Sequence, residues 1–284
     1  MLADGIGREY RMQTAIEYWK QRVEGHYLQS TKVQGKSLWA SSEFWQPLMA
    51  NFRVDPHRTN DEVLDHLLNI INEDATVIDV GGGAGRFALP LALKCKHVVV
   101  VEPADSMVES LNEVGQESGI DNVTVVSELW EDAEVESADI VLSAHSVYGV
   151  AEPQGFIRKL ESKATQKVVI VAYLEQPQTQ LSPFWKPLYG EERVDLPALH
   201  ELMNLLWELD IHPNLEMFPP SPVPTFKDEK VAFEQLKHRL HVEDGSEEEN
   251  RLRSAIHDLL VETSTGLAIK GAKLRRLGVL TWAP

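Results

Sequence analysis

The sequence is poor in cysteine, in long apolar runs and in basic residues. The single cysteine, Cys95, can form no internal disulfide and cannot hold a metal by itself, which suits a reducing, cytoplasmic location. No stretch approaches the roughly twenty apolar residues that span a bilayer. Residues 1–13 carry charges early and lack the apolar core of a signal peptide. We therefore expect a soluble protein that is neither secreted nor inserted into a membrane.

The deficit of positive charge limits the partners of the protein. Against 44 acidic side chains stand 27 lysines and arginines, which gives a formal net charge of -17. This charge opposes the neutralisation of phosphates on which nucleic-acid binding depends, and it opposes docking on anionic lipid. We expect a neutral or cationic small-molecule substrate, with no nucleic acid and no membrane as partner. The sequence does not specify an oligomeric state.

From about residue 60 onward, short apolar segments alternate with segments of helical spacing. The segment 98–101 has no polar face, and a strand buried on both faces is typical of a parallel sheet. Alternating strands and helices favour right-handed crossovers. We predict an α/β fold with a doubly wound, mainly parallel seven-stranded sheet. Its strands are expected at 77–80, 98–101, 123–126, 140–143, 168–173, 214–218 and 274–282.

The remaining segments predict the domain organisation. Residues 1–59 are rich in large aromatics without strand alternation, and we expect a helical, aromatic N-terminal lid. Residues 60–284 are expected to form the Rossmann-like domain, with Asn60 as the N-cap of its first helix. Within it, residues 219–265 begin with a proline-rich connection and continue with two amphipathic helices. They predict a helical cap inserted before the last strand.

Four glycines crowd the turn between the first predicted strand and the next helix: Gly81, Gly82, Gly83 and Gly85. Without a Cβ atom, such residues let backbone N–H groups and a helix N-terminus approach a ligand closely. A tight turn that needs positive φ explains one or two glycines but not four. The loop therefore favours a nucleotide-like ligand. Dinucleotides and S-adenosylmethionine both remain open, because Ala88 completes the spacing G-x-G-x-x-A.

Asp79, two residues before the first glycine, distinguishes these ligands. Together with Gly81, Gly83 and Gly85 it matches the pattern acid-x-Gly-x-Gly-x-Gly, and in these residues the sequence resembles the class I S-adenosylmethionine-dependent methyltransferases. The resemblance implies that the carboxylate organises the loop and the cationic methionine end of the cofactor, S-adenosyl-L-methionine. It covers the middle of the chain, and the whole chain is more loosely similar to uncharacterised bacterial members. The family also implies that the final strand is antiparallel.

Other segments are expected to complete the cofactor site. Glu102, at the end of the second strand and followed by Pro103, is placed to accept from ribose hydroxyls. The resemblance implies an adenine contact by Glu128, although the residues there are not the usual ones. Trp130 could stack on adenine, whereas a lone tryptophan more often packs in the core. The predicted cofactor-binding residues are Asp79, Gly81, Gly82, Gly83, Gly85, Glu102, Pro103, Glu128, Leu129, Trp130, Ser143 and Ala144.

The loop after the fourth strand is expected to face the reacting methyl group, because ligands of doubly wound folds lie beyond the carboxyl ends of the central strands. His145 is the candidate general base and Tyr148 is expected to shape the pocket, so these two form the predicted catalytic pair. A histidine that only hydrogen-bonds within the loop fits equally well. Arg53 and Arg58 could reach a carboxylate, although surface positions are favoured.

A small-molecule methyltransferase is thus the function that the sequence favours. Two alternatives are a catalytically silent protein that binds S-adenosylmethionine as a scaffold and, less favoured, an NAD(P)-dependent oxidoreductase. The sequence lacks an Asn-Pro-Pro-Tyr loop and a catalytic Pro-Cys pair, which argues against amino-group methylation of adenine or glutamine and against cytosine C5 methylation. Cys95 is expected on the buried face of a core helix. We expect no metal site.

Overall fold

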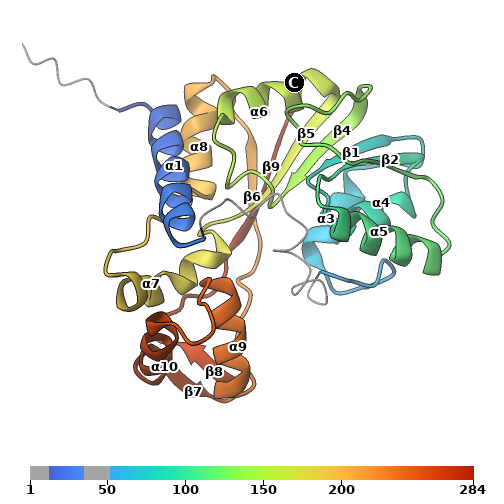
Figure 1. Cartoon of the computed structure of the whole chain (residues 1–284). Helices are drawn as coiled ribbons and strands as arrows, with labels where there is room; N and C mark the ends of the chain where they lie inside the picture. Colours follow the sequence, from blue (N-terminus) through green and yellow to red (C-terminus); the bar gives the residue numbers. More distant parts are fainter. Residues whose placement is uncertain (1–12, 35–51) are drawn as a thin grey trace, which may run out of the picture.

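The computed structural model describes residues 13–34 and 52–284, and its centre is a seven-stranded sheet with the strand order β3-β2-β1-β4-β5-β9-β6 (Figure 1). Neighbouring strands from β3 to β5 are parallel, whereas β9 is antiparallel to both β5 and β6. The predicted fold class and the antiparallel last strand are therefore confirmed. The strands are β1 (Thr76–Val80), β2 (His97–Val101), β3 (Val123–Val126), β4 (Ala138–Ala144), β5 (Ala164–Tyr173), β6 (Asn214–Met217) and β9 (Leu277–Trp282).

Strand β5 is longer than its apolar pattern predicts. It begins at Ala164, whereas the apolar run begins only at Val168. The side chains of Thr165 and Gln166 donate hydrogen bonds to Asp139 Oδ1, at 3.4 and 2.7 Å. Polar side chains at the solvated end of a strand leave no hydrophobic signal, and so the sequence pattern missed the beginning of this strand.

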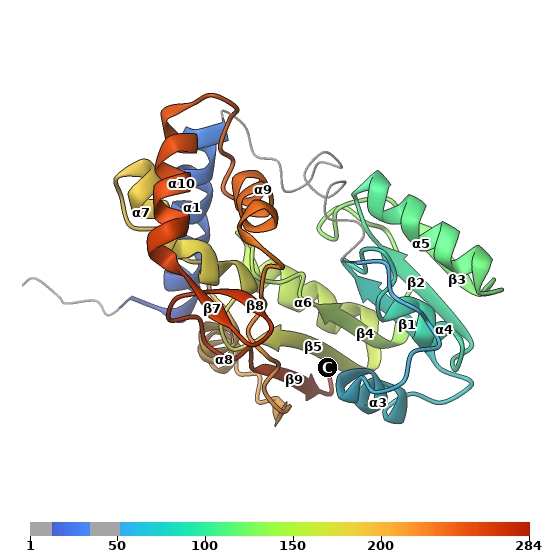
Figure 2. The same ribbon diagram turned by 90° about the horizontal axis from the view of Figure 1, so that it is seen from below.

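Helices cover both faces of the sheet, as expected for parallel strands that are joined by crossovers. One face packs against α1 (Ala15–Gln34), α6 (Pro153–Lys163) and α8 (Leu199–Glu208), and the other against α3 (Glu62–Asn69), α4 (Ala88–Ala92) and α5 (Asp105–Glu117). Figures 1 and 2 show these two sets on opposite sides. In α1, Trp19 and Val23 are fully buried, so this helix is part of the core packing.

The beginning of α3 corrects one prediction. Asp61, and not Asn60, is the N-cap: its side chain accepts the Leu64 N–H at 3.1 Å. Asn60 has φ 67°, in the left-handed region that asparagine tolerates better than most residues. Of the predicted lid at 1–59, residues 1–12 and 35–51 lie outside the described residues. The division into lid, domain and cap stays a prediction.

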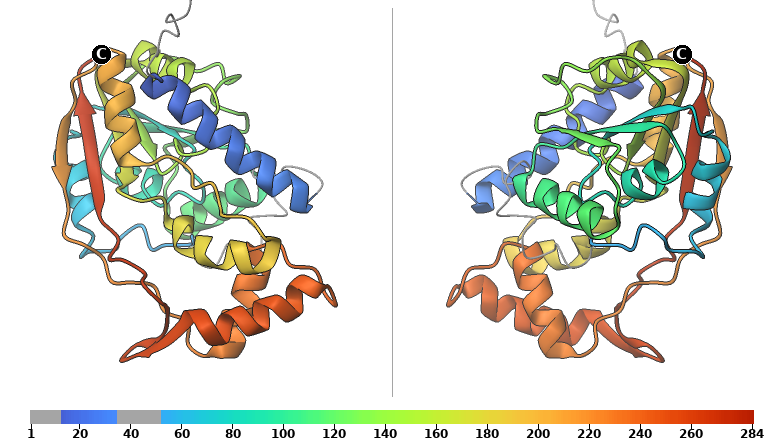
Figure 3. Two further views of the ribbon diagram at one scale, coloured as in Figure 1. Left: turned by 90° about the vertical axis from the view of Figure 1, so that its left-hand side faces the viewer. Right: turned by 90° about the vertical axis from the view of Figure 1, so that its right-hand side faces the viewer.

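A second, smaller core lies beyond one end of the sheet, and we call the elements around it the cap. They are η2 (Pro177–Leu181), α7 (Ser182–Tyr189), α9 (Glu229–Arg239), α10 (Glu247–Leu259), β7 (Leu260–Thr263) and β8 (Gly266–Ile269). Figure 3 shows the cap at the end of the sheet away from the C-terminus. The two predicted helices are present as α9 and α10, but the hairpin β7–β8 and α7 were not predicted.

The position of the cap relative to the strands determines what it can cover. Strand β9 follows the cap and begins at Leu277, which pairs with Tyr173 at the carboxyl end of β5. The cap therefore leaves and rejoins the sheet at the carboxyl ends of the parallel strands, the edge at which doubly wound folds bind ligands. None of the described helices has the length and apolarity needed to cross a bilayer.

Candidate functional site

The candidate site lies where the strand order reverses. Strand β1 pairs with β2 on one side and with β4 on the other, so the chain leaves β1 and β4 in opposite directions and opens a crevice at their carboxyl ends. The glycine loop follows β1, and the loop with His145 follows β4. Ser146 joins the two loops, because its Oγ donates to Val80 O at 2.7 Å. A Cβ atom at Gly81 would lie 2.5 Å from Ser146 Cβ, so only glycine fits this contact.

Different physical constraints act at the four glycine positions of the loop. Positive φ angles of 69°, 55° and 82° occur at Gly81, Gly83 and Gly85. A Cβ atom would meet Val100 Cγ1 at 2.8 Å from Gly82 and Leu89 Cγ at 2.8 Å from Gly85. Packing therefore explains these positions, contrary to the expectation that four glycines require a ligand.

Gly83 is the exception among the four. A Cβ atom there would meet only Met107 Sδ, at 3.9 Å. Open space beside a backbone amide at the end of β1 is what a close approach by a ligand requires. Among the four glycines, Gly83 is thus the one beside which the structure leaves open space.

Glu102 holds the glycine loop in place. Its Oε2 accepts the Gly83 N–H at 3.0 Å and its Oε1 accepts the Ala104 N–H at 2.9 Å. The carboxyl is buried, and burial raises its pKa above the ordinary value although both backbone donors lower it. Each oxygen keeps a free lone pair, so Glu102 can still accept from two hydroxyls. Pro103, partly buried, connects Glu102 to α5.

Asp79 is a buried acid with an unused acceptor. It lies in β1 with 1% of its surface exposed, and its Oδ1 has no hydrogen-bond partner among the described residues. Burial and the nearby Glu102 carboxylate raise its pKa to about 7, although the Ala88 N–H lowers it. A lone carboxylate in such a place is unfavourable unless a cation or a donor joins it. The arrangement fits a ligand that brings positive charge.

His145 and two tyrosines form a stack after β4. The His145 ring lies on Tyr173, with 4.7 Å between centroids and 14° between planes, and its Nδ1 is 3.3 Å from the Tyr148 hydroxyl. That hydroxyl also accepts the Tyr173 N–H at 2.7 Å. If Nδ1 donates to the tyrosine oxygen, a lone pair remains on Nε2 and can accept a proton. The two predicted catalytic side chains are thus in contact.

Burial first, and then the charges of Arg86 and Arg275, lower the pKa of His145 to about 4. The imidazole is therefore neutral near pH 7, as a base must be. Its backbone has φ 62°, a left-handed conformation that is rare for a residue other than glycine. Residues that the surrounding fold holds in an unfavourable backbone conformation are concentrated at functional sites. The neutral imidazole can accept a proton, although a pKa lowered to about 4 makes it a weak base.

The two predicted residues just before His145 support the loop. Ser143 is fully buried in β4, and its Oγ lies 2.8 Å from Ser146 Oγ. Ala144 is partly buried and ends the strand. Together with the Ser146 bond to β1, these contacts hold the His145 loop against the glycine loop. The hydrophobic pattern of β4 did not indicate Ser146, because its role is a contact with a distant strand.

The predicted adenine segment follows β3. Glu128 is exposed and Leu129 is 47% exposed, so both are accessible to a ligand. Trp130 instead packs in the core, where Lys159 Nζ lies 4.9 Å from the ring centroid and donates to Trp130 O at 2.6 Å. A ring that is buried in this way does not offer a face for stacking on adenine. The packing alternative therefore describes Trp130.

The arginines before α3 differ from each other. Arg53 forms exposed ion pairs with Glu113 and Glu117 of α5, at 2.9 and 2.6 Å, as a surface residue does. The Arg58 side chain is only 13% exposed, donates to Asp61 at 3.1 Å, and leaves Nη2 buried without a partner among the described residues. Arg58 is thus no surface arginine, and its free donor lies next to Phe87 at the end of the glycine loop.

Comparison with known proteins agrees with this geometry. Residues 71–198, which hold β1 to β5 and both loops, match the model of a protein family described as "Methyltransferase domain". A candidate methyltransferase from Bacillus halodurans C-125 has a similar structure, with a TM-score of 0.53 over 78% of this chain and 97% of that one, at 16% sequence identity. The predicted resemblance to methyltransferases is thus confirmed for residues 71–198, and the similar solved structure has the same fold.

Two curated relatives match part of the chain. An uncharacterised protein of Haemophilus influenzae is 29% identical over 147 residues, which are 51% of this chain and 54% of that protein. A protein of Methanosphaera stadtmanae named "Probable ribosomal RNA small subunit methyltransferase A" is 26% identical over 132 residues, or 44% of this chain and 48% of that protein. The chain thus spans about half the length of these relatives.

Proposed function

We propose that the protein binds S-adenosyl-L-methionine in the crevice between β1 and β4 and transfers its methyl group to a small molecule. The observation that carries this proposal is the buried Asp79 carboxylate, whose Oδ1 has no partner among the described residues and lies behind a glycine loop that is open only at Gly83. A cationic ligand would compensate the Asp79 carboxylate, and the open space at Gly83 would let it approach the loop. A dinucleotide brings a pyrophosphate, and its negative charge would be repelled by Asp79 and Glu102.

The residues have distinct tasks in this proposal. Asp79 would offset the positive charge of the bound cofactor, Glu102 would accept from ribose hydroxyls, and Glu128 with Leu129 would flank the adenine. When bound, the cofactor would supply a methyl group on a sulfonium: the acceptor atom would bond to the methyl carbon as its bond to sulfur breaks, with S-adenosylhomocysteine as the leaving group. The His145 loop lies at the neighbouring strand end and holds the acceptor beside that methyl group. In-line transfer depends mainly on such positioning.

Proton removal is the second task of the His145 loop. With a pKa of about 4, His145 is neutral near pH 7 and can take a proton from the acceptor on Nε2. In the tautomer that carries its proton on Nδ1, that N–H would donate to the Tyr148 oxygen and Nε2 would be free. Tyr173 covers one face of the imidazole and excludes water from it. His145 would thus be a catalytic residue and Tyr148 a positioning residue.

Calorimetric titration with S-adenosylmethionine, S-adenosylhomocysteine and NADH tests the cofactor assignment. We expect both adenosyl compounds to bind and NADH not to bind. Binding of NADH alone would refute the proposal and favour the oxidoreductase alternative.

A matched pair of glycine variants tests the position of the site. Gly83 and Gly119 both have positive φ, of 55° and 67°, and a Cβ atom at either meets nothing closer than 3.9 Å. Gly83→Ala and Gly119→Ala should each lose about 1–2 kcal/mol of stability. Only Gly83→Ala should weaken cofactor binding, since only its methyl group would enter the crevice. Equal affinity of the two variants would show that the loop is not the binding site.

A further inference from the structure

Helix α1 lies against the loop that carries His145. This loop, the His145 loop, comprises residues 145–152 between β4 and α6. Trp19 of α1 is fully buried and belongs to the same core cluster as Val147 and Tyr148 of the loop. Because α1 precedes residues 71–198, the part of the chain that matches the methyltransferase family, these contacts come from outside the matched residues.

Two side chains of α1 hold consecutive carbonyl groups of the His145 loop. The Tyr27 hydroxyl donates to Gly149 O at 3.0 Å, and Trp19 Nε1 donates to Val150 O at 2.9 Å. Trp19, Val23 and Tyr27 are spaced four residues apart, so they lie on one face of the helix. A peptide group whose oxygen is bound in this way cannot rotate without loss of the hydrogen bond. Helix α1 therefore restricts the backbone of the loop.

The absence of a side chain at Gly149 is explained by Tyr27. A Cβ atom at Gly149 would overlap the Tyr27 hydroxyl oxygen, and its next neighbour would be Tyr27 Cζ at 3.4 Å. The φ angle of Gly149 lies outside the left-handed region, so the backbone conformation does not require glycine. The glycine therefore serves the close approach of the Tyr27 hydroxyl to the loop.

Gly149 is next to the groups that hold His145. The Tyr148 hydroxyl accepts the Tyr173 N–H at 2.7 Å and lies 3.3 Å from His145 Nδ1. Tyr148 directly precedes Gly149, so a shift of Gly149 moves the backbone that carries this hydroxyl. His145 itself has φ 62°, and a residue other than glycine keeps such a conformation only where its surroundings enforce it. Tyr27 is thus linked to His145 through two neighbouring residues of the loop.

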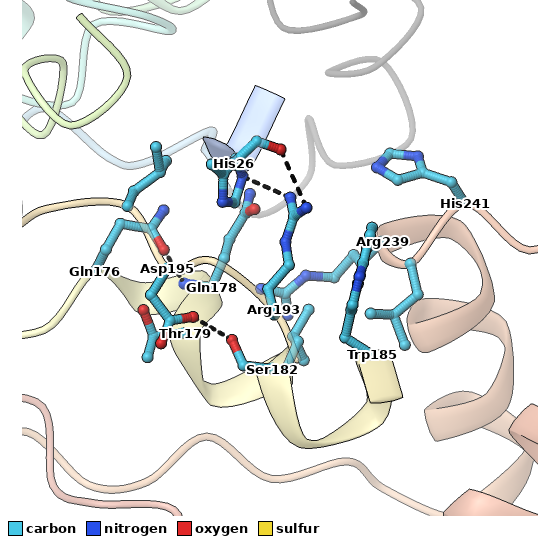
Figure 4. A pocket seen from close by; sticks show the side chains of 13 residues that line it. His26, Gln176, Gln178, Thr179, Ser182, Trp185, Arg193, Asp195, Arg239 and His241 are labelled. Atoms are coloured by element: carbon cyan, nitrogen blue, oxygen red, sulfur yellow. Dashed lines mark hydrogen bonds between the residues drawn. The ribbon is translucent and has the colours of Figure 1, made fainter. Parts of the chain in front are cut away.

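Helix α1 is itself fixed by the segment between α7 and α8. His26 Nδ1 lies 2.7 Å from Val194 O. His26 Nε2 lies 2.7 Å from Arg193 Nη2, as drawn in Figure 4. An arginine can only donate, so Nε2 accepts, and Nδ1 carries the proton that is donated to Val194 O. Burial, and then the charge of Arg193, lower the pKa of His26 to about 3, so the imidazole is neutral in this arrangement near pH 7.

Further hydrogen bonds join the same two elements. Arg193 donates to Ser30 Oγ at 2.7 Å, and Gln29 Oε1 accepts the Val194 N–H at 2.8 Å. These contacts lie at one wall of the polar cavity in Figure 4, which His26 and Arg193 help to line. Helix α1 therefore has a fixed position from which its side chains reach the His145 loop.

We propose that Tyr27 is a positioning residue of the methyl-transfer site: through Gly149, its hydroxyl holds the His145 loop in the conformation that places His145 beside the acceptor. The role of His145 in this statement rests on the proposed function, whereas the position of the loop rests on the contacts of α1. Helix α1 would thus be part of the active-site scaffold and not only a cover of the sheet.

The imidazole resonances of His145 in a proton–carbon NMR spectrum test this role. They are identified by their absence in His145→Gln. The ring current of Tyr173, with 4.7 Å between centroids and 14° between planes, should displace them from the resonances of an exposed histidine. Tyr27→Phe should move them toward the position of an exposed histidine, because the loop loses its hydrogen bond to Tyr27.

Tyr189→Phe is the matched control. It also removes a tyrosine hydroxyl that donates to a backbone carbonyl, Leu240 O at 2.6 Å, but this contact lies within the cap. The His145 resonances of Tyr189→Phe should coincide with those of the wild-type protein. The inference is overturned if these resonances do not move in Tyr27→Phe, or if Tyr189→Phe moves them as much.

Gly149→Ala tests the same contact from the side of the loop. In the wild-type background the added methyl group overlaps the Tyr27 hydroxyl, so this variant should have a lower Tm and displaced His145 resonances. In the Tyr27→Phe background the nearest heavy atom is Cζ at 3.4 Å, an ordinary van der Waals distance, so the same substitution should lower the Tm much less. An equal loss of Tm in both backgrounds would overturn the inference.

Titration of the same samples with S-adenosylhomocysteine separates this inference from the proposed function. The wild-type protein and Tyr27→Phe should bind it with equal affinity, since the hydrogen bond of Tyr27 is to the His145 loop and not to the glycine loop. If the wild-type protein does not bind it, while the His145 resonances still depend on Tyr27, only the proposed function is refuted. Weaker binding by Tyr27→Phe alone would place Tyr27 in the cofactor site and overturn the inference.

Discussion

Replacement of Asp79 by asparagine changes one buried ionisable group and little else. The two side chains have the same shape, and the asparagine oxygen can still accept the Ala88 N–H that acts on Asp79. Burial and Glu102 raise the Asp79 pKa from 3.8 to about 7. The folded protein therefore holds this proton more tightly than the unfolded chain does. As the pH rises from about 4 to about 7, the wild-type protein should lose stability, and above about pH 7 the loss from this group should stop.

The size of the effect follows from the two pKa values. Between about pH 5 and about pH 8, the linkage relation gives a loss of roughly 2.5 kcal/mol in the free energy of unfolding from Asp79 alone. Asp79→Asn lacks this term but keeps a buried amide with an unsatisfied N–H group, which costs about 1–3 kcal/mol at every pH. The variant should thus be less stable than the wild type near pH 5 and approach or exceed it near pH 8.

Urea unfolding of both proteins without ligand, at several pH values from about 5 to about 8, measures the difference. The free-energy difference between variant and wild type should shift in favour of the variant by roughly 2.5 kcal/mol across this range. Because the charges of Asp79 and Glu102 act on each other, the slope from Glu102 cancels only in part. A pH-independent difference would refute the raised pKa of Asp79. Cofactor affinity offers a second readout: it should increase with pH in the wild type, because only the ionised Asp79 attracts a cation, and not in Asp79→Asn.

Three other measurements test His145, Tyr148 and Asp61. If His145 is the base, the rate of methyl transfer should be constant from about pH 6 to about pH 9 and should fall only as the pH approaches the His145 pKa of about 4. An inflection of the rate near pH 6.5 would contradict the burial of the imidazole. Tyr148→Phe leaves the part-buried Tyr173 N–H without this acceptor and should reduce stability by about 1–3 kcal/mol in urea unfolding. An unchanged midpoint would argue against that hydrogen bond. Asp61→Ala removes the N-cap of α3 and should destabilise the protein by about 1–2 kcal/mol. Asp61→Asn should retain most of the stability. Equal losses in the two variants would show that the N-cap hydrogen bond is unimportant.

The sequence alone determined the seven strands of the main sheet and the crossover helices between β1 and β5, because buried parallel strands need continuous apolar runs and crossover helices need a period of 3.6 residues. It also located the Asp79 glycine loop, since a close backbone approach after a strand can be read from local residue types. Only the tertiary structure decided that Gly81, Gly82 and Gly85 serve packing, that Trp130 is buried, and that Ser146 and Tyr173 support the His145 loop. These contacts join residues that are far apart in the chain, and no local pattern records them.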